Sequence, residues 1–444
     1  MKKRITTISL NPNDILSTVI CTLLTLYSTL SMLLNRFMST NLQFIILIGV
    51  MVLELYYLGV KWHKSLYLFI LAALAMIVIP FLTFNRNAWS HGRTMFFVDT
   101  LLMCFMIVKR ADLADRVLSV MGVMYMFYAI CTIAFYFMPG FYRGYVVDLF
   151  PDSKLRLIRW YNSGCMPGLT NHYSTNGMFM ATGLVLSLSR MQQNRKLSDW
   201  GRSLIFVIAL LLTGKRAHFI FGAFTLFMMT YYWQRSRGGN VLNRWFRFIG
   251  IILVLLSVGV IVISSVPALS TFLQRFQLDS GSDDISSGRF MLWSLAVQSF
   301  LKHPILGIGW EMFKPSVSVL YMASDRLFDV HNVYIQLLCE VGVIGFALYM
   351  WWFIRCFMKS AAVYRRPGFM RSLNGRERNR INFALGFQIF FLLYCFTGNP
   401  LYDREMFFPY FLSCGIALHY GLRSDPRARA PLTDNRMLIH EQIQ

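Results

Sequence analysis

Two arginines and one histidine, far apart along the chain, are the residues whose types best suit catalysis. Arg216 ends a Thr-Gly-Lys-Arg sequence, Arg289 ends a Ser-Gly-Arg sequence, and His331 stands directly before a long apolar segment. An arginine side chain binds phosphate oxygens through two parallel hydrogen bonds and stays charged. A histidine accepts a proton from a hydroxyl group near neutral pH. Together the three residues would suit a reaction in which a diphosphate leaves and a sugar hydroxyl attacks.

Each cation in this set also has an ordinary structural interpretation. Lys215 and Arg216 lie in a tight turn between two apolar segments, where a lysine can simply extend to the lipid head groups. Ionisable groups at membrane depth usually face the interior of a helix bundle and mark function, which favours a functional role for Arg216. Arg289 stands at a predicted helix start, where a positive charge is unfavourable unless an anion binds there. Pairing with Asp283 or Asp284 is the alternative for Arg289.

His331 begins a polar edge that continues into the following predicted helix. We expect Asn332 and Tyr334 to contact the substrate together with His331, Lys215 and the two arginines. Glu340 lies nine residues further on, which at about 100° per residue places it on the opposite face and roughly 13 Å deeper. Glu340 is therefore predicted to be a structural carboxylate paired across helices. An ordinary hydrogen-bonded polar residue is the alternative interpretation of His331.

The elements that must position these residues are membrane helices. The chain has 444 residues, of which 56% are hydrophobic and 14% charged, and a mean hydropathy of +0.49, which is typical of a membrane protein. A membrane span needs about 20 mostly apolar residues. No small-residue cleavage site follows the first apolar segment, so we expect a retained helix. The sequence predicts twelve spans, at 15–34, 42–60, 65–84, 95–108, 117–139, 173–189, 203–214, 216–233, 246–266, 333–358, 381–398 and 406–422.

The distribution of basic residues predicts the orientation of the chain. With both termini in the cytoplasm, the cytoplasmic segments hold 28 of the 43 Lys and Arg residues, as the positive-inside rule requires. The net charge of +22 is thereby explained without nucleic acid as a partner. Segments 140–172 and 267–332 become long outer loops. Segment 359–380 becomes a basic cytoplasmic loop that would face anionic lipids.

The larger outer loop contains a predicted amphipathic helix that begins near Ser287 and continues to Leu301. Phe290, Trp293, Val297 and Phe300 form its apolar stripe at helical spacing, and His303-Pro304 ends it. A helix of this kind would lie at the membrane surface and could cover a cavity.

Neither a metal site nor a cofactor is predicted. The eight cysteines form no Cys-x-x-Cys pair, and seven of them lie in predicted spans, which also argues against a disulfide framework. Asp283 and Asp284 could imitate a metal site, but a solvated helix start is the better interpretation. The two halves of the chain share no landmarks, which argues against a transporter built from two repeats.

The motifs as a set resemble the O-antigen ligase and O-antigen polymerase superfamily of bacterial membrane glycosyltransferases. The resemblance covers residues 168–345 and depends on the order and shared outer location of motifs that are individually weak. The motifs are Gly168–His172, Thr213–Arg216, Ser287–Arg289 with Trp293, His303–Gly309, His331-Asn332 and Glu340–Gly345.

This resemblance implies an all-α, polytopic enzyme of the GT-C-like class in the bacterial cytoplasmic (inner) membrane. Its donor would be a polyprenyl-diphosphate-linked oligosaccharide, and its acceptor a glycan or lipid-linked glycan. Arg216 and Arg289 would contact the diphosphate, and His331 would be the base. Membrane lipids and polysaccharide assembly proteins would be its other partners. Polymerisation of surface polysaccharide repeats is the preferred activity. Ligation to lipid A-core, or a lipid-linked glycan flippase or other twelve-span transporter, remains as an alternative.

Overall fold

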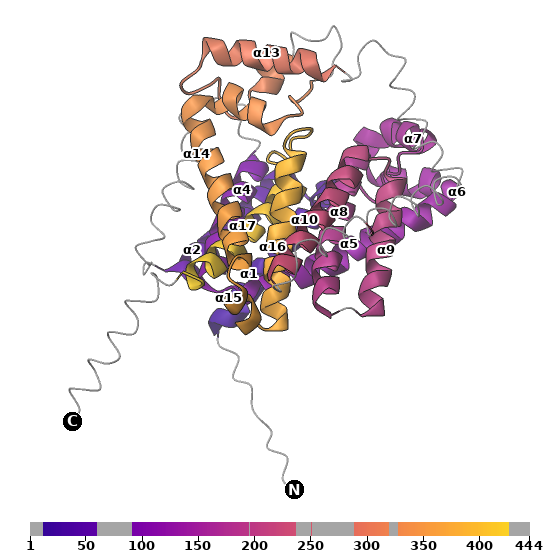
Figure 1. Cartoon of the computed structure of the whole chain (residues 1–444). Helices are drawn as coiled ribbons and strands as arrows, with labels where there is room; N and C mark the ends of the chain where they lie inside the picture. The colour runs from indigo at the N-terminus through magenta and orange to yellow at the C-terminus, as the bar shows by residue number, and fades with distance from the viewer. Residues whose placement is uncertain are drawn as a thin grey trace, which may run out of the picture.

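Every regular element in the described part of the chain is a helix (Figure 1). The computed structural model describes residues 12–59, 91–194, 196–236, 250, 288–318 and 327–425. A helix satisfies all its backbone polar groups internally, so a chain this apolar forms helices where it meets lipid.

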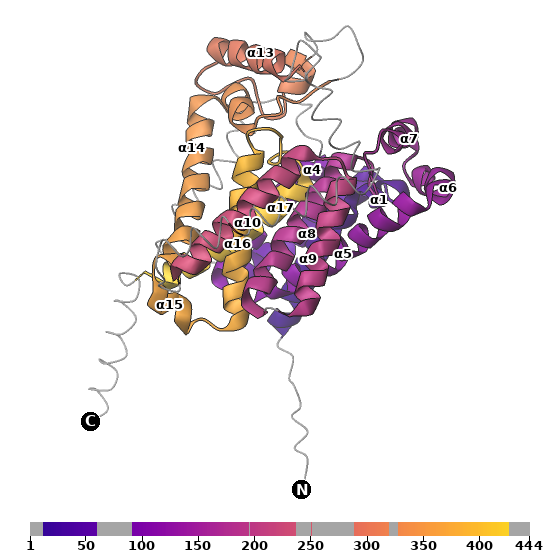
Figure 2. The ribbon, with the colours of Figure 1, turned by 45° about the vertical axis from the view of Figure 1, so that its right-hand side comes forward.

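The longer helices form one bundle, except for α13, which lies at one end of it together with several of the short helices (Figures 1 and 2). The long helices are α1 (Pro12–Phe37), α2 (Thr40–Leu58), α4 (His91–Lys109), α5 (Leu113–Phe137), α8 (Tyr173–Asn194), α9 (Leu197–Leu212), α10 (Arg216–Ser236), α13 (Arg289–Lys302), α14 (Val333–Tyr364), α16 (Gly375–Tyr394) and α17 (Arg404–Arg423). The short ones are α6 (Pro139–Phe141), η2 (Tyr142–Val146), η3 (Val147–Leu149), η4 (Pro151–Ser153), α7 (Lys154–Asn162), η5 (Phe313–Val317) and α15 (Pro367–Ser372).

Ion pairs gather several helix ends at one end of the bundle. Arg380 near the start of α16 pairs with Asp115 near the start of α5 at 2.5 Å. Arg110 after α4 pairs with Asp14 in the first turn of α1, and Arg423 at the end of α17 pairs with Glu377. Figures 1 and 2 place α15 at this end of the molecule and α13 and α7 at the opposite end. We call the end with α13 the outer end, following the predicted orientation of the chain.

Four of the described helices, α1, α2, α5 and α14, are long and apolar enough to cross a membrane. The other predicted spans in the described part of the chain fall on α4, α8, α9, α10, α16 and α17. The spans predicted at 65–84 and 246–266 lie outside the described residues, apart from Gly250. The all-helical, membrane-type fold is thus confirmed, and the total of twelve spans stays a prediction.

The predicted loops contain more helix than expected. Segment 140–172 contains α7 and a series of short helical turns packed around Tyr142 and Leu157. Segment 359–380 contains the end of α14, all of α15 and the first turns of α16. These helical turns could not be predicted from the sequence, because each one is too short to show a helical period of apolar residues.

The predicted outer helix is present as α13, but its buried face differs from the expected one. Leu292 and Ala296 pack against residues that include Val330, Cys339 and Phe313, whereas Phe290 and Val297 from the predicted stripe are exposed. The exposed apolar side suits contact with a membrane surface.

Helix α14 is broken at Gly342, where the backbone adopts φ 62° and ψ −170°. The segment Pro304–Gly309 lies against the break. The amides of Ile308 and Gly309 donate to the carbonyls of Cys339 and Glu340 at 3.0 and 2.8 Å. In return, the amide of Val343 donates to the carbonyl of Pro304 at 2.8 Å.

The glycine at the break allows this close contact. A Cβ on Gly342 would lie 2.2 Å from the carbonyl oxygen of Ile305, in the outer loop. The break attaches that loop to the helix that follows His331.

Candidate functional site

The start of α14 is fastened to the end of α16. The side-chain oxygen of Asn332 accepts from the amides of Tyr334 and Ile335 at 3.0 and 3.2 Å and so caps the helix. The amide of Val333 donates to the carbonyl of Cys395 at 2.8 Å, and the hydroxyl of Tyr334 donates to the carbonyl of Leu392 at 2.9 Å. Asn332 and Tyr334 thus hold the helix start in place, and their contact with substrate stays a prediction.

His331 precedes the cap and has a strained backbone. Its φ of 55° lies in the left-handed region, which costs a non-glycine residue about 1–3 kcal/mol and often marks functional sites. The indole of Trp293 in α13 donates to the carbonyl of Val330 at 3.0 Å and fixes the preceding peptide. The predicted outer helix therefore positions the predicted base.

The surroundings of His331 keep it neutral. The pKa of its imidazole is lowered to about 4, chiefly by burial and also by the charges of Arg289 and Lys215, while the charge of Asp329 opposes this shift. Asp329 is itself paired with Lys314 at 2.5 Å. At neutral pH the His331 ring therefore carries no charge and has a free proton-accepting nitrogen.

Lys215 turns into the same site. Gly214, with a φ of 70°, forms the turn between α9 and α10, and the Lys215 ammonium lies over the ring of Tyr173 at 4.7 Å. Gly177 of α8 allows this approach, because a Cβ there would lie 3.1 Å from Cγ of Lys215. Burial, followed by the charge of Arg289, lowers the pKa of Lys215 to about 8.

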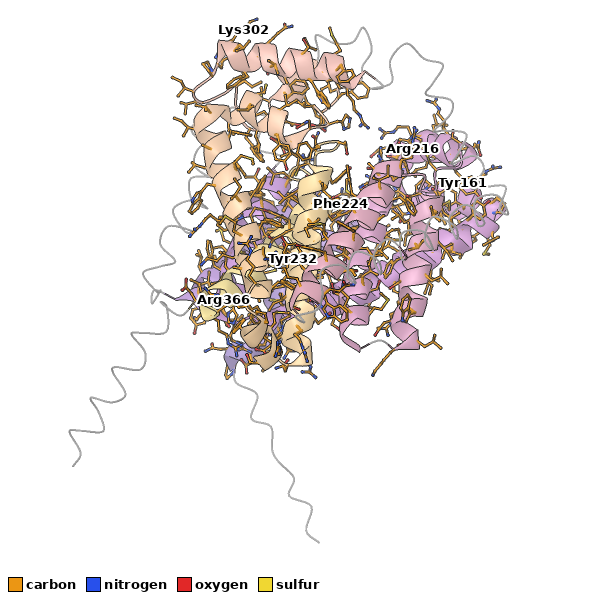
Figure 3. All side chains as sticks on the ribbon, in the orientation of Figure 1. Tyr161, Arg216, Phe224, Tyr232, Lys302 and Arg366 are labelled. Atoms are coloured by element: carbon orange, nitrogen blue, oxygen red, sulfur yellow. The ribbon has the colours of Figure 1, made fainter. Side chains whose placement is uncertain are left out.

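The two arginines begin two helices at the outer end of the bundle. Arg289 is the first residue of α13 and Arg216 the first of α10. Figure 3 shows Lys302, the last residue of α13, on the side away from Arg216, so α13 begins on the side of Arg216. Arg289 and Lys215 are among the charges that act on His331, so the three residues lie within electrostatic range of one another. Arg216 follows Lys215 in the chain and is half-buried.

A second histidine, His172, belongs to this cluster, although it was not among the predicted site residues. Its Nδ1 accepts from the amide of Ser174 at 3.0 Å, so its proton is on Nε2 and can be donated. The ring of Trp160 packs against it at 4.3 Å. Burial lowers the pKa of His172 to about 3, with Lys215 the next cause. The motif Gly168–His172 was the available signal in the sequence.

Asp403, the residue before α17, is an acidic member of the same region. Burial, with Glu405 and Asp329 next, raises the pKa of its carboxyl to about 7. Its charge acts on Lys215. No pattern in the sequence separates this aspartate from an ordinary helix cap.

Glu340 has a structural role, as predicted, but its partners are not those expected. Its carboxylate accepts hydrogen bonds from the amides of Glu311 and Phe313, from the side chain of Gln336 and from the hydroxyl of Tyr402, at 2.7 to 3.1 Å. Three of these four partners lie outside α14, and none of them is a cation or His331.

The acidic alternative for Arg289 and the possible imitation of a metal site both depend on residues that the structure does not describe. Asp283 and Asp284, the predicted alternative partners of Arg289, lie outside the described residues. Among the residues that the structure does describe, no group of three or more His, Cys, Asp or Glu side chains could hold a metal ion. All eight cysteines are free thiols.

Comparison with known proteins supports the resemblance to the O-antigen ligase and polymerase superfamily. Residues 203–350 match a family model described as O-antigen ligase. This range contains Lys215, Arg216, Arg289 and His331, together with the last ten residues of α9, all of α10 and α13, and the broken part of α14. A search of curated proteins finds no match.

Proposed function

Since residues 203–350 match the O-antigen ligase family, we propose that this chain polymerises surface polysaccharide by glycosyl transfer from a polyprenyl-diphosphate-linked glycan. The surface polysaccharide would be O-antigen, capsule or exopolysaccharide. The reaction takes place at the outer face of the bacterial cytoplasmic membrane, with both termini in the cytoplasm. The observation that carries this proposal is a neutral histidine, His331, beside two cations, Arg289 and Lys215.

The proposed reaction is one displacement at the anomeric carbon of the donor sugar. The acceptor hydroxyl oxygen forms the new bond, and the bond from the anomeric carbon to the diphosphate oxygen breaks. His331 takes the hydroxyl proton. Arg289, Lys215 and Arg216 stabilise the negative charge that develops on the leaving diphosphate. His172 can donate a hydrogen bond to the same group through Nε2.

Donor binding also prepares the base. Arg289 and Lys215 lower the pKa of His331 in the absence of an anion. A bound diphosphate offsets their charge, so the pKa of His331 rises and the imidazole becomes a stronger base. Activation of the base therefore depends on the presence of the donor.

Ligation to lipid A-core uses the same donor and the same chemistry and is the alternative function. The two activities differ only in the acceptor, and the family match suits both. A flippase or other transporter would instead need charges along a path through the bundle. The cations described here lie at the outer end of the bundle, which favours glycosyl transfer over transport.

The test is glycan synthesis by the purified full-length chain in liposomes supplied with lipid-linked repeats. We expect chain growth with the native protein and a loss of about 100-fold or more with His331→Ala. His303→Ala is the matched control, since His303 is an exposed histidine at the end of α13. Unchanged chain growth in both His331→Ala and Arg289→Ala would show that the site is assigned wrongly. Growth only when lipid A-core is added would identify a ligase.

A further inference from the structure

The lipid-facing side of α5 leads to a surface that lies outside the predicted spans. Helix α5 is long and apolar enough to cross a membrane. Four of its large apolar residues are exposed and follow one another after four, three and seven positions: Val123, Phe127, Ile130 and Phe137. These intervals place them on one face of the helix. Because lipid is the apolar phase around a membrane helix, this face marks the side of α5 that contacts lipid.

The exposed apolar stripe continues after α5 has ended. Phe141 in α6 and Tyr145 in η2 follow Phe137 at intervals of four residues and are 45% and 70% exposed. Their neighbours Tyr142 and Val146 are buried. The short helical turns therefore present an apolar edge on one side and pack against the protein on the other. A tyrosine at the end of such a stripe is typical of the membrane–water interface.

The segment that carries this edge, residues 138–162, is packed firmly on the bundle, and we call it the α6–α7 unit. Its buried core contacts the ends of α1, α5 and α9 through Leu33, Phe135 and Leu212. The rings of Tyr142 and Tyr161 stack at 4.8 Å and join the short turns to α7. The apolar edge is therefore a fixed surface of the protein.

The polar side chains of the unit lie beyond its apolar edge. Figures 1 and 2 both show α6 at the edge of the molecule, with α7 further toward the outer end. Arg156 and Arg159 in α7 are exposed, and Asp148 of the same unit pairs with Lys154 and so does not neutralise either arginine. Apolar side chains at the lower level and arginines above them match the acyl chains and the phosphates of a lipid leaflet.

The continuity of the stripe favours lipid over a protein partner. A soluble protein that covered Tyr145 would leave the rest of the stripe, from Val123 to Phe137, to the membrane beside it. The outer leaflet covers the whole stripe at once.

The α6–α7 unit also contacts the cation site. Trp160 of α7 packs against the rings of His172 and Tyr173 at 4.3 and 5.1 Å. The ammonium of Lys215 lies over the ring of Tyr173 at 4.7 Å. Helix α7 thus supports the aromatic residues on which Lys215 rests. The depth of the unit in the membrane therefore sets the depth of Lys215.

We propose that the α6–α7 unit is an interfacial anchor, which inserts Phe141 and Tyr145 into the outer leaflet and holds Lys215 at the level of the lipid phosphates. A lipid-linked diphosphate carries its phosphates at this level, so the donor reaches the cation site without leaving the membrane. The role in donor binding rests on the proposed function, whereas the membrane contact does not.

The first experiment measures the depth of the unit in a bilayer. The full-length chain with Tyr145→Cys, labelled with the fluorophore NBD, is placed in phosphatidylglycerol-containing nanodiscs whose acyl chains are brominated or unmodified. Asp152→Cys, an exposed position in η4 of the same unit, is the matched control. The native cysteines are buried or half-buried, and the parent chain treated with the same label corrects for background. We expect brominated chains to quench the label at 145 about twofold or more and aqueous iodide to quench only the label at 152.

The second experiment measures how the unit affects the use of the donor. The double variant Phe141→Ser, Tyr145→Ser should raise KM for the lipid-linked donor about fivefold or more and leave kcat within about twofold. KM for a water-soluble donor with a short prenyl chain should stay unchanged, because that donor does not enter from the membrane. Tyr56→Ser is the matched control, since Tyr56 in α2 is 73% exposed and lies outside the unit. Thermal unfolding of each variant identifies any loss caused by misfolding.

The outcomes distinguish the anchor from the proposed function. If iodide quenches the label at 145 and brominated chains do not, the edge faces water and the anchor is wrong, even where glycan is transferred. If neither agent quenches it, a protein such as a second copy of the chain covers the edge, and the anchor is again wrong. If the label lies among the acyl chains but the double variant keeps its KM for the lipid-linked donor, the unit does not set the depth of the cation site. If the label lies among the acyl chains and the native chain transfers no glycan to any acceptor, the membrane contact stands and the proposed function is wrong.

Discussion

Replacing Glu340 with glutamine tests whether this carboxylate joins the broken helix to the outer loop. Oε1 of Glu340 accepts from the amide of Phe313 and the side chain of Gln336, and Oε2 accepts from the amide of Glu311 and the hydroxyl of Tyr402. A glutamine retains one oxygen and presents an NH₂ group in place of the other. Two of the four donors then face another donor.

The loss of stability depends on which of the four donors can reorient. The hydroxyl of Tyr402 can rotate to accept from the new NH₂, and the amide of Gln336 can flip to present its oxygen. The backbone amides of Glu311 and Phe313 cannot change, so one of them loses its acceptor in either orientation. A buried, unsatisfied N–H costs about 1–3 kcal/mol, and the remaining bonds lose their charge assistance. We expect Glu340→Gln to lower the free energy of unfolding by about 2–3 kcal/mol.

The assay is thermal or denaturant unfolding of the purified chain in detergent, with Glu54→Gln as the matched control. Glu54 is also a fully buried carboxylate, but neither of its oxygens has a hydrogen-bond partner in the described part of the chain. Replacing its carboxyl group with an amide should therefore be neutral or stabilising. Equal effects of the two substitutions, or a stabilising Glu340→Gln, would refute the role assigned to Glu340.

The other predictions concern pH and backbone geometry. Because the pKa of His331 lies near 4, below its ordinary value, the base becomes protonated only in acid. The value of kcat/KM for donor should therefore hold from pH 7 to about 5 and fall to half near pH 4. In the pH profile of kcat, the fall in acid should occur at a higher pH than in the profile of kcat/KM, since bound diphosphate offsets the charge of the cations. Initial-rate profiles in which kcat and kcat/KM fall at the same pH would contradict this. Lys215 loses its charge as pH rises through about 8, so KM for donor should rise above pH 8, and Lys215→Arg should abolish the rise. Gly307→Ala should destabilise the fold by about 3 kcal/mol or more in the same unfolding assay, because φ is 72° and the new Cβ would lie 2.4 Å from the Glu340 carbonyl carbon; a variant as stable as the native protein would show that the loop does not depend on this contact.

Sequence reasoning located elements whose signal is local. Long apolar segments indicated the helices, and His303-Pro304 indicated the end of α13 because proline cannot continue a helix. The glycines at 307 and 309 were part of a recognised motif, and both adopt positive φ values.

Features that depend on distant partners were not predictable. The break at Gly342 requires the carbonyls of Pro304 and Ile305, more than thirty residues earlier, to satisfy the freed amides. The orientation of Lys215 depends on Tyr173 from another helix, and a single sequence does not show which ring lies beneath an ammonium. The buried face of α13 likewise follows from Val330 and Cys339, which lie outside that helix.

The two strained residues show how α14 relates the outer loop to the proposed base. Among the described residues other than glycine, only Glu311 and His331 have positive φ values. Glu311 lies in the loop, and His331 is the proposed base. Glu311 is held by its hydrogen bond to Glu340, and His331 directly precedes the capped first turn of the same helix. Because the turns between the cap and Glu340 are unbroken, the helix fixes the spacing between the base and the point where the loop attaches. The break at Gly342 comes just after Glu340, where the loop that contains Trp310 and Glu311 attaches.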